Sequence, residues 1–267
     1  MSTASFGRRL LTVTGMQALG PTYRLLKVAD PGGPEPQPGQ FAMLAAAERW
    51  GGGLDERPYL PRAFSIARHR DGESHFLLED VGPGTRRLCE LEEGEGLWSL
   101  GPLGVGFTRP SQERRAILVG GGVGIAPLAL LQDALGAETT ALLGFRDAAC
   151  TAGGALLDGA HVASDDGSAG HEGPVTDLLA AELRRDAHAV VYACGPAGML
   201  EAVRAMCAAA DVPAQLALEA GMACGFGACF GCVVARRGGG YLRVCVDGPV
   251  IDAAELERVE EHAGAPS

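Results

Sequence analysis

The chain of 267 residues is 47% apolar and carries a formal net charge of −11. This length suits two or three small domains, and the acidic balance argues against a nucleic-acid partner, which would need a basic face. The longest uncharged run, residues 116–131, is too short to span a membrane and contains four glycines and a proline. Because no long apolar segment lies near the first residue, we expect a cytoplasmic protein that binds no membrane.

The first hundred residues contain short runs with strand character, separated by Gly, Pro and charged residues. Strands at this spacing predict a small antiparallel β-barrel. The predicted strands are residues 10–19, 23–30, 39–46, 63–70, 74–81 and 96–104.

Two places in this predicted barrel carry polar groups that strand alternation does not require. Arg62 and Ser65 lie on one strand, and Gly82, Gly84 and Thr85 form a turn before a predicted short helix. An arginine, a hydroxyl and free N–H groups at a helix start are what a pyrophosphate needs. The alternatives are a surface charge at Arg62 and an ordinary helix N-cap at Thr85.

Residues 114–200 alternate between strands and helices, which predicts a parallel sheet with helices on both faces. A strand runs into the glycine turn 120–124, and a later strand, 189–193, runs into Cys194-Gly195-Pro196. Both turns then fall at the carboxyl ends of strands, where such sheets bind ligands. The glycine run is not the usual G-x-G-x-x-G pattern, so a tight turn without a ligand remains an alternative.

Of the eight cysteines, Cys194 belongs to the Cys-Gly-Pro turn, and the other seven are of two kinds. Cys89, Cys150 and Cys207 are scattered, as small buried apolar residues are. The other four follow the spacing C-x4-C-x2-C-x12-C, which is typical of a plant-type [2Fe–2S] cluster, with a zinc site as the alternative. We therefore predict that the iron is held by Cys224, Cys229, Cys232 and Cys245.

Taken together, these segments resemble a known family. The order of Arg-x-x-Ser, the glycine turn and Cys-Gly-Pro is similar to the ferredoxin–NADP reductase superfamily. The cysteine segment narrows the likeness to the electron-transfer subunits of dihydroorotate dehydrogenase B. The motifs that carry it, in chain order, are PGQF, GPLGVGF, GGGVGIAPL, DDGSAGHEGPVTDLL, CGPAGML, MACGFGACFGCVV and VCVDGPV.

The resemblance implies three domains and three cofactors: an FAD-binding barrel over residues 1–108, an NAD-binding α/β domain over 109–212, and a [2Fe–2S] domain over 213–267. It also implies a partner subunit that holds FMN and oxidises dihydroorotate, in a heterotetramer with two of each chain. Electrons of pyrimidine biosynthesis would then run from that FMN through the cluster and FAD to NAD. No residue of this chain needs to be a catalytic acid or base.

The resemblance also assigns the contacts residue by residue. Arg62 is expected on the FAD pyrophosphate, and Cys194 and Gly195 near the nicotinamide and the flavin ring. Two departures from the family pattern are Ala63, where proline is frequent, and Asp80, where arginine is frequent. The expected flavin residues are Arg62, Ala63, Phe64, Ser65, Glu79, Asp80, Val81, Gly84 and Thr85. The expected nucleotide residues are Gly120, Gly121, Gly122, Gly124, Cys194 and Gly195.

Two questions stay open at this point. Asp165 and Asp166 favour NAD, because carboxylates repel a 2′-phosphate, while Arg146 would favour NADP. The chain would also suit the reductase subunit of another redox complex, such as a sulfhydrogenase, a sulfite reductase or an NADH-dependent ferredoxin–NADP oxidoreductase. A zinc-stabilised binding module without redox activity is the alternative from a different class.

Overall fold

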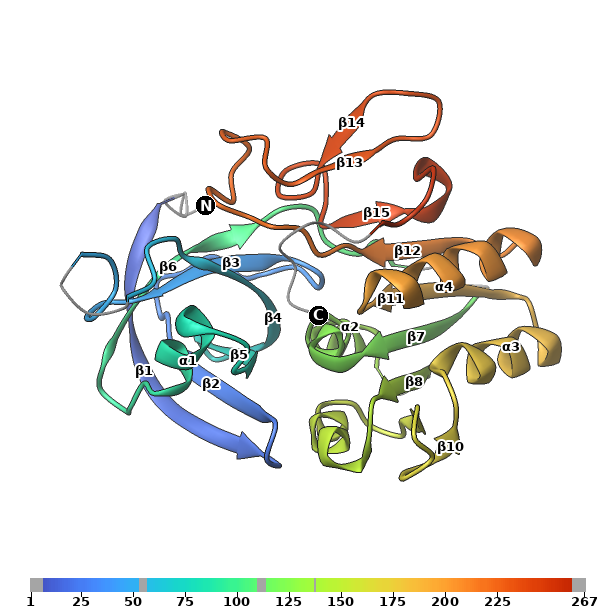
Figure 1. Cartoon of the computed structure of the whole chain (residues 1–267), viewed down its shortest axis with the longest axis horizontal. Helices are drawn as coiled ribbons and strands as arrows, with labels where there is room; N and C mark the ends of the chain where they lie inside the picture. Colours follow the sequence, from blue (N-terminus) through green and yellow to red (C-terminus); the bar gives the residue numbers. More distant parts are fainter. Residues whose placement is uncertain (1–6, 53–56, 110–113, 137, 261–267) are drawn as a thin grey trace.

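The computed structural model describes residues 7–52, 57–109, 114–136 and 138–260. It confirms the predicted fold class, with an antiparallel barrel, a largely parallel α/β sheet and a small C-terminal segment that carries the cysteines (Figure 1). Within those ranges, no helix has both the length and the apolarity needed to cross a membrane.

The barrel closes in the strand order β1-β2-β5-β4-β3-β6. Strand β1 pairs with both β2 and β6 and so closes the barrel. Its alternation gives the barrel an apolar interior: Leu11 and Val13 point into the core, while Leu10 and Thr12 face outward. The short helix α1 packs on the barrel core through Leu88. The bounds are β1 Arg8–Leu19, β2 Tyr23–Ala29, β3 Phe41–Ala46, β4 Arg62–Arg70, β5 Glu73–Glu79, α1 Pro83–Cys89 and β6 Gly96–Leu103.

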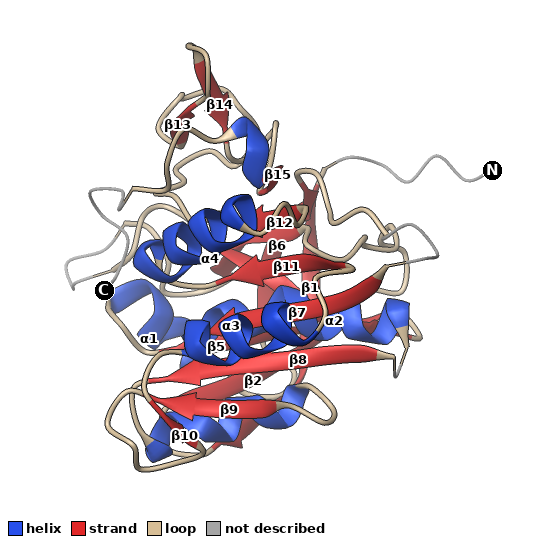
Figure 2. Ribbon diagram, turned by 90° about the vertical axis from the view of Figure 1, so that its right-hand side faces the viewer, coloured by secondary structure: helices blue, strands red, loops and turns tan. Residues whose placement is uncertain are grey.

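The α/β sheet has the strand order β10-β9-β8-β7-β11-β12-β15, and only the β12–β15 pair is antiparallel. Helix α2 lies between this sheet and the barrel, and α3 and α4 cover the opposite face (Figure 1, Figure 2). The interior strand β11 is buried along its whole length, as expected for a strand covered on both faces. The bounds are β7 Arg115–Gly121, η1 Gly122–Gly124, α2 Ile125–Leu135, β8 Thr139–Phe145, η2 Ala148–Leu156, β9 His161–Ser164, β10 His171–Glu172, α3 Val175–Arg185, β11 Ala189–Cys194, α4 Ala197–Ala209, β12 Ala214–Ala217 and β15 Val250–Asp252.

The C-terminal segment does not fold apart from the rest. Its hairpin, β13 Val233–Ala235 and β14 Tyr241–Arg243, projects beyond the β15 edge of the sheet and is followed by η3 Ala253–Glu255 (Figure 2). The division at residues 108 and 212 stays a prediction. Both β12 and β15 lie beyond residue 212, and both are strands of the α/β sheet.

One apolar cluster joins all three parts of the chain. It contains Met43 and Leu103 from the barrel, Val191 from the α/β sheet, and Cys232 and Cys245 from the cysteine segment. Because buried side chains of all three parts pack together, the relative positions of the parts are fixed by packing rather than by linkers alone.

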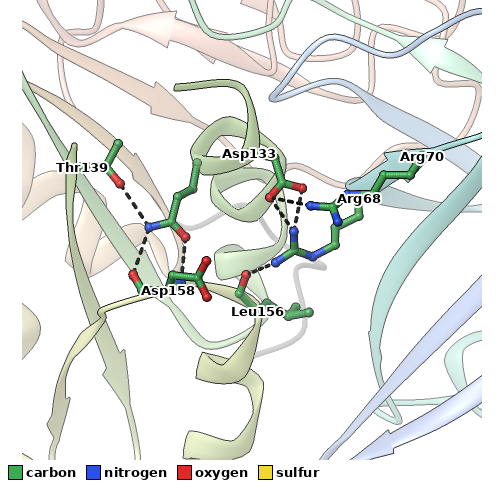
Figure 3. A network of polar contacts seen from close by, with 7 residues as sticks. Arg68, Arg70, Asp133, Thr139, Leu156 and Asp158 are labelled. Atoms are coloured by element: carbon green, nitrogen blue, oxygen red, sulfur yellow. Dashed lines mark hydrogen bonds and ion pairs between the residues drawn. The ribbon is translucent and has the colours of Figure 1, made fainter. Parts of the chain in front are cut away.

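A network of hydrogen bonds and ion pairs also joins the barrel to α2 (Figure 3). Arg68 on β4 donates from Nη1 to both carboxylate oxygens of Asp133, at 2.5 and 2.6 Å, and from Nη2 to the carbonyl of Leu156 at 2.6 Å. Arg70 adds a second ion pair to Asp133 at 3.3 Å. The β4–β5 register shifts between Ile66 and Arg68. Such a bulge re-aims side chains, which accounts for an arginine at this position reaching the helix.

Candidate functional sites

Arg62, the first residue of β4, lies over the start of α1. A Cβ atom added to Gly84 would lie 2.5 Å from Arg62 Nε, so the guanidinium rests directly on the helix backbone. The same guanidinium donates to the carbonyl of Leu60 at 2.6 Å and lies 5.9 Å from the ring centre of Trp50. Among the described residues, no side chain caps α1. A cation beside the first N–H groups of a helix suits a pyrophosphate.

The loop before α1 is organised by Thr85. Its hydroxyl donates to the carbonyl of Gly82 at 3.0 Å and accepts from the N–H of Val81 at 2.9 Å. Asp80 forms an ion pair with Arg86 at 3.2 Å. The hydroxyl therefore shapes this turn instead of capping the helix, and the nearby carboxylate already has a cationic partner.

The remaining residues of the Arg-x-x-Ser motif divide between the two faces of β4. Ser65 lies opposite Phe41 and Ala63 opposite Met43 in the antiparallel ladder with β3. Residues opposite one another share a face, so Ser65 and Ala63 lie on the outer face beside buried Phe41 and Met43. Phe64 packs against the barrel interior.

The two turns at the carboxyl edge of the sheet pack backbone against backbone. A Cβ atom on Gly124 would lie 2.5 Å from the carbonyl oxygen of Cys194 and 2.6 Å from the nitrogen of Gly195. A Cβ atom on Gly195 would lie 2.9 Å from the nitrogen of Gly121. Gly122 has φ +55°, in the left-handed region that favours glycine. The glycines therefore let the two turns meet without side chains between them.

Gly120 and Cys194 are buried positions at the same edge. A Cβ atom on Gly120 would lie 3.0 Å from Ile125 Cγ2, so this glycine serves the packing of α2 on its strand. Burial raises the pKa of the Cys194 thiol well above its ordinary value, and the nearby charge of Glu219 raises it further. The Glu219 side chain reaches the surface but is densely surrounded by protein, and this desolvation raises the pKa of its carboxyl.

The barrel and the α/β sheet also meet through polar side chains near the glycine turn. Arg146, just after β8, forms an ion pair of 3.4 Å with Glu79 at the end of β5. The hydroxyl of Tyr23 lies 4.0 Å from the position that a Cβ on Gly122 would take. Burial raises the pKa of Tyr23, and the charge of Glu79 adds to the rise. Glu79 therefore faces the α/β domain rather than α1.

The four C-terminal cysteines differ in burial. Cys232 and Cys245 are buried in the shared apolar cluster, while Cys229 is exposed. The N–H of Cys245 lies 3.5 Å from Cys232 Sγ, and the Cys229 side chain is among the groups that lower the pKa of Cys224. Burial, the Cys232 thiol and then the charge of Cys224 raise the pKa of Cys245 to about 12. The cysteines thus form two pairs within electrostatic reach of each other.

Backbone N–H groups surround the sulfur of Cys224. Burial opposes ionisation of this thiol, but hydrogen bonds from the backbone of Phe226, Cys229 and Ala228 outweigh burial and lower its pKa to about 6. The N–H of Gly231 lies 3.5 Å from Cys229 Sγ. Donors of this kind stabilise thiolates and tune the potential of a bound metal centre.

The residues of this segment fit an iron–sulfur cluster by donor chemistry and backbone shape. Gly225 and Gly227 have φ +79° and +86°, and Phe230 has φ +57°, so the loop wraps tightly around its thiols. Among the residues that the structure describes, no group of three or more His, Cys, Asp or Glu side chains is gathered into a metal site. Four thiols with inward-facing N–H groups are nevertheless the donor set of a [2Fe–2S] centre.

Comparison with known proteins identifies the family. A family model described as the iron–sulfur cluster binding domain of dihydroorotate dehydrogenase B matches residues 219–257. The chain is 36% identical over 263 residues to the Geobacillus kaustophilus protein named dihydroorotate dehydrogenase B (NAD(+)), electron transfer subunit, with 94% of this chain and 98% of the relative covered. The chain belongs to this family of electron transfer subunits.

Other members of the electron transfer subunit family are similarly close. The protein of Caldanaerobacter subterraneus is 37% identical, with 84% of this chain and 88% of the relative covered. The protein of Methanopyrus kandleri, named as a probable member, is 38% identical, with 84% and 82% covered.

Solved structures of other proteins share the fold of this chain. The chain superposes on a chain of the NADH-dependent reduced ferredoxin-NADP oxidoreductase with a TM-score of 0.79 and 26% identity, covering 95% of this chain and 92% of that one. The flavohem-like FAD/NAD binding domain of nitric oxide dioxygenase from Vibrio cholerae shares the fold alone, with a TM-score of 0.62, 22% identity and coverages of 76% and 94%.

In this electron transfer subunit, the structure brings some of the predicted residues together and separates others. Arg62 meets Gly84, and the glycine turn meets Cys194. Asp80 instead pairs with Arg86. Sequence reasoning missed Tyr23 and Glu219. Tyr23 had one available signal, since an aromatic side chain with a polar tip opens a strand directly after a turn.

Proposed function

We propose that this chain carries electrons between NAD and a separate catalytic subunit of dihydroorotate dehydrogenase B, using FAD and a [2Fe–2S] cluster. Membership of the electron transfer subunit family supports the general role. The observation that carries the proposal is the cysteine segment, where four thiols and sulfur-directed N–H groups lie inside the region that matches the family's cluster-binding domain.

Each cofactor has residues suited to hold it. Arg62 and the start of α1 at Gly84 would hold the flavin pyrophosphate, with Ala63 and Ser65 facing the ring. The glycine turn and Cys194 would hold the nicotinamide end of NAD. When bound, the cluster moves single electrons, nicotinamide exchanges hydride, and a flavin can do both. The protein residues therefore bind and orient, and we assign no catalytic acid or base.

We propose NAD rather than NADP as the nucleotide. Asp165 and Asp166 follow β9 and are tied to the end of β8, because their N–H groups donate to the carbonyls of Phe145 and Arg146 at 3.0 and 3.4 Å. Ser168 donates to Asp166 from its hydroxyl and its N–H, and these bonds lower the pKa of the carboxyl. Two carboxylates at this edge would repel a 2′-phosphate. Comparable kcat/KM for NADH and NADPH would contradict this choice.

The partner is proposed to be an FMN-containing dihydroorotate dehydrogenase, in a heterotetramer with two copies of each chain. The apolar rim formed by the exposed side chains of Phe226, Phe230, Tyr241 and Val246 supports docking through the cysteine segment. Arg243 lies 5.4 Å from the ring centre of Phe230, which adds a cation to this rim. Large exposed apolar side chains beside polar ones are typical of a protein interface.

One other function has support from a specific observation. The superposition on the NADH-dependent reduced ferredoxin-NADP oxidoreductase favours a reductase subunit of another redox complex. The two functions differ only in the partner, because both need the same three cofactors.

Anaerobic co-purification from the native host tests the proposal. We expect a brown-yellow complex with about two irons per copy of this chain, one FAD, and an FMN subunit that oxidises dihydroorotate. A partner of another enzyme class would support the alternative function. A colourless chain that holds one zinc would contradict both.

A further inference from the structure

The loop that begins at Cys224 lies directly on the outer surface of the barrel. Gly225 has φ +79°, and a Cβ atom added to it would lie 2.5 Å from Met43 Cγ, 2.8 Å from Met43 Sδ and 3.3 Å from Leu103 Cδ1. The backbone beside the first cysteine therefore touches two barrel side chains with no room for a side chain of its own. Space and backbone conformation both require glycine at this position.

Met43 and Leu103 lie outside the barrel interior, yet neither is exposed to solvent. Their exposed fractions are 2% and 5%, and they belong to the same apolar cluster as Cys232 and Cys245. The barrel interior forms a different cluster, to which the neighbouring Ala42 and Leu44 of β3 belong. The cysteine segment thus covers part of Met43 and Leu103, through the backbone of Gly225.

Met43 also borders the strand that carries the expected flavin residues. It lies opposite Ala63 in the β3–β4 ladder, on the shared outer face. Opposite residues in such a ladder are about 5 Å apart at their Cα atoms. Ala63 is exposed, while Met43 beside it is covered. One side chain therefore separates the cysteine loop from the face of Ala63.

We propose that Met43 is a positioning residue that sets the spacing between the cluster loop and the flavin strand. This inference rests on the proposed function, because it takes Ala63 and Ser65 to face the flavin and Cys224 to hold iron. Methionine suits the position, because its unbranched thioether fills irregular gaps and is polarisable. A displacement of the loop changes the gap that an electron must cross, and the rate of electron exchange depends on that gap.

The first test needs no cofactor. In the cluster-free full-length chain, alkylation of Cys224 and Cys229 is followed by mass spectrometry in four proteins: wild type, Met43→Ala, Gly225→Ala and the double variant. We expect faster alkylation in each single variant. In the double variant, removal of Met43 makes room for the new Cβ, so we expect slower alkylation than in Gly225→Ala. Such non-additivity is the mark of a direct contact.

The second test uses the flavin- and cluster-loaded protein. Stopped-flow absorbance compares the rate at which NADH reduces the cluster with the rate at which it reduces a flavin-directed dye. We expect the ratio of these rates to fall in Met43→Ala, because a displaced loop alters the gap that an electron must cross. It should stay near the wild-type value in Met43→Leu, which keeps the volume. The matched control is Met206→Ala, because Met206 packs against the same apolar cluster from α4.

The outcomes separate this inference from the function on which it rests. If iron and flavin are present but Met43→Ala leaves the ratio unchanged, the positioning role is wrong while the function stands. Additive alkylation in the double variant overturns the direct contact in the same way. If Met43→Ala does not fold, Met43→Leu and Gly225→Ala still decide the matter, since the contact predicts a normal ratio for the first and a lowered one for the second.

Discussion

The barrel is joined to the rest of the chain by two contacts of opposite character. At α2 the contact includes the ion pair of Arg68 and Asp133, whose side chains are 20% and 25% exposed. At the cysteine segment the contact is apolar, with Met43 and Leu103 beneath the backbone of Gly225. Both contacts fix the position of the barrel, one through charge and hydrogen bonding and the other through close apolar packing.

The two contacts differ in how well they tolerate substitution. An ion pair near the surface keeps partial hydration and is screened by salt. Its loss should therefore move the surrounding backbone little. A close-packed apolar contact has no solvent to substitute for a missing group, so a small volume change moves the backbone or leaves a cavity. We therefore expect the function to depend more strongly on the cysteine-segment contact.

The largest effect is expected from removing an iron ligand. Cys229→Ser should abolish iron binding and weaken assembly with the partner, because the cluster would lose one of four thiolates and the loop its organising centre. FAD should stay bound, since Arg62 and Gly84 lie in the barrel. Iron and flavin analysis of the purified variant checks this, with Cys89→Ser as the control. Full iron content in Cys229→Ser would contradict the ligand assignment.

A cavity beneath the cysteine loop should have the next largest effect. Leu103→Ala should lower the free energy of unfolding by about 2–5 kcal/mol and speed hydrogen exchange in residues 224–232. Leu44→Ala is the matched control, because Leu44 is fully buried inside the barrel. It should cost similar stability while leaving exchange in the cysteine loop unchanged. Equal exchange in both variants would show that the apolar contact does not order the loop.

Removing the polar contact between Arg68 and Asp133 at α2 should lower the free energy of unfolding by less. Asp133→Ala should lower the free energy of unfolding by about 1–2 kcal/mol, and the difference from wild type should shrink at high salt. Urea unfolding at low and high salt measures both. Glu255→Ala, which breaks the half-exposed pair with Arg236, should change stability by less than about 0.5 kcal/mol. A salt-independent loss in Asp133→Ala would mean that packing, not charge, dominates there.

The smallest effect concerns pH and the C-terminal segment. Glu201 on α4 accepts hydrogen bonds from Arg204 and from the N–H of Val259. The Arg204 bond and then the Val259 bond lower the pKa of Glu201 from 4.5 to about 2, against the effect of burial. A depressed pKa contributes stability above pH 4.5 that is lost as pH falls toward 2.

Glu201→Gln tests this contribution. The variant should be less stable than wild type at neutral pH by under about 1 kcal/mol, because the group is partly exposed. The difference should shrink as the pH is lowered from 4.5 toward 2. Urea unfolding across that range measures it, and a difference that grows on acidification would contradict the assigned direction.

The parts of the fold that could be predicted are those with local signals. Glycine, proline and charged residues separate the barrel strands, and the apolar run of β11 continues directly into Cys194-Gly195-Pro196. The strands β12 and β15 carry no such signal, because they are four and three residues long and gain their partners from distant segments. The cysteine set could be predicted for the same local reason, since three ligands fall within nine residues.

The contacts between domains could not be predicted. Arg146 and Glu79 are 67 positions apart in the sequence, and Tyr23 lies near the glycine turn although the two are distant in the sequence. Met43 looks like an ordinary strand residue in the sequence. Its contact with Gly225 depends on where the C-terminal segment packs against the barrel. No local pattern in the sequence indicates that position.

Dihydroorotate-dependent reduction of NAD by a reconstituted complex tests the proposed electron path from the partner subunit to NAD. This chain, loaded with FAD and the cluster, is mixed with the FMN-containing dihydroorotate dehydrogenase subunit, and NADH formation is followed by absorbance. We predict NADH formation only when both subunits are present and only with wild-type cysteines. Equal NAD reduction by the Cys229→Ser complex, or full-rate dihydroorotate oxidation by this chain alone, would contradict the account.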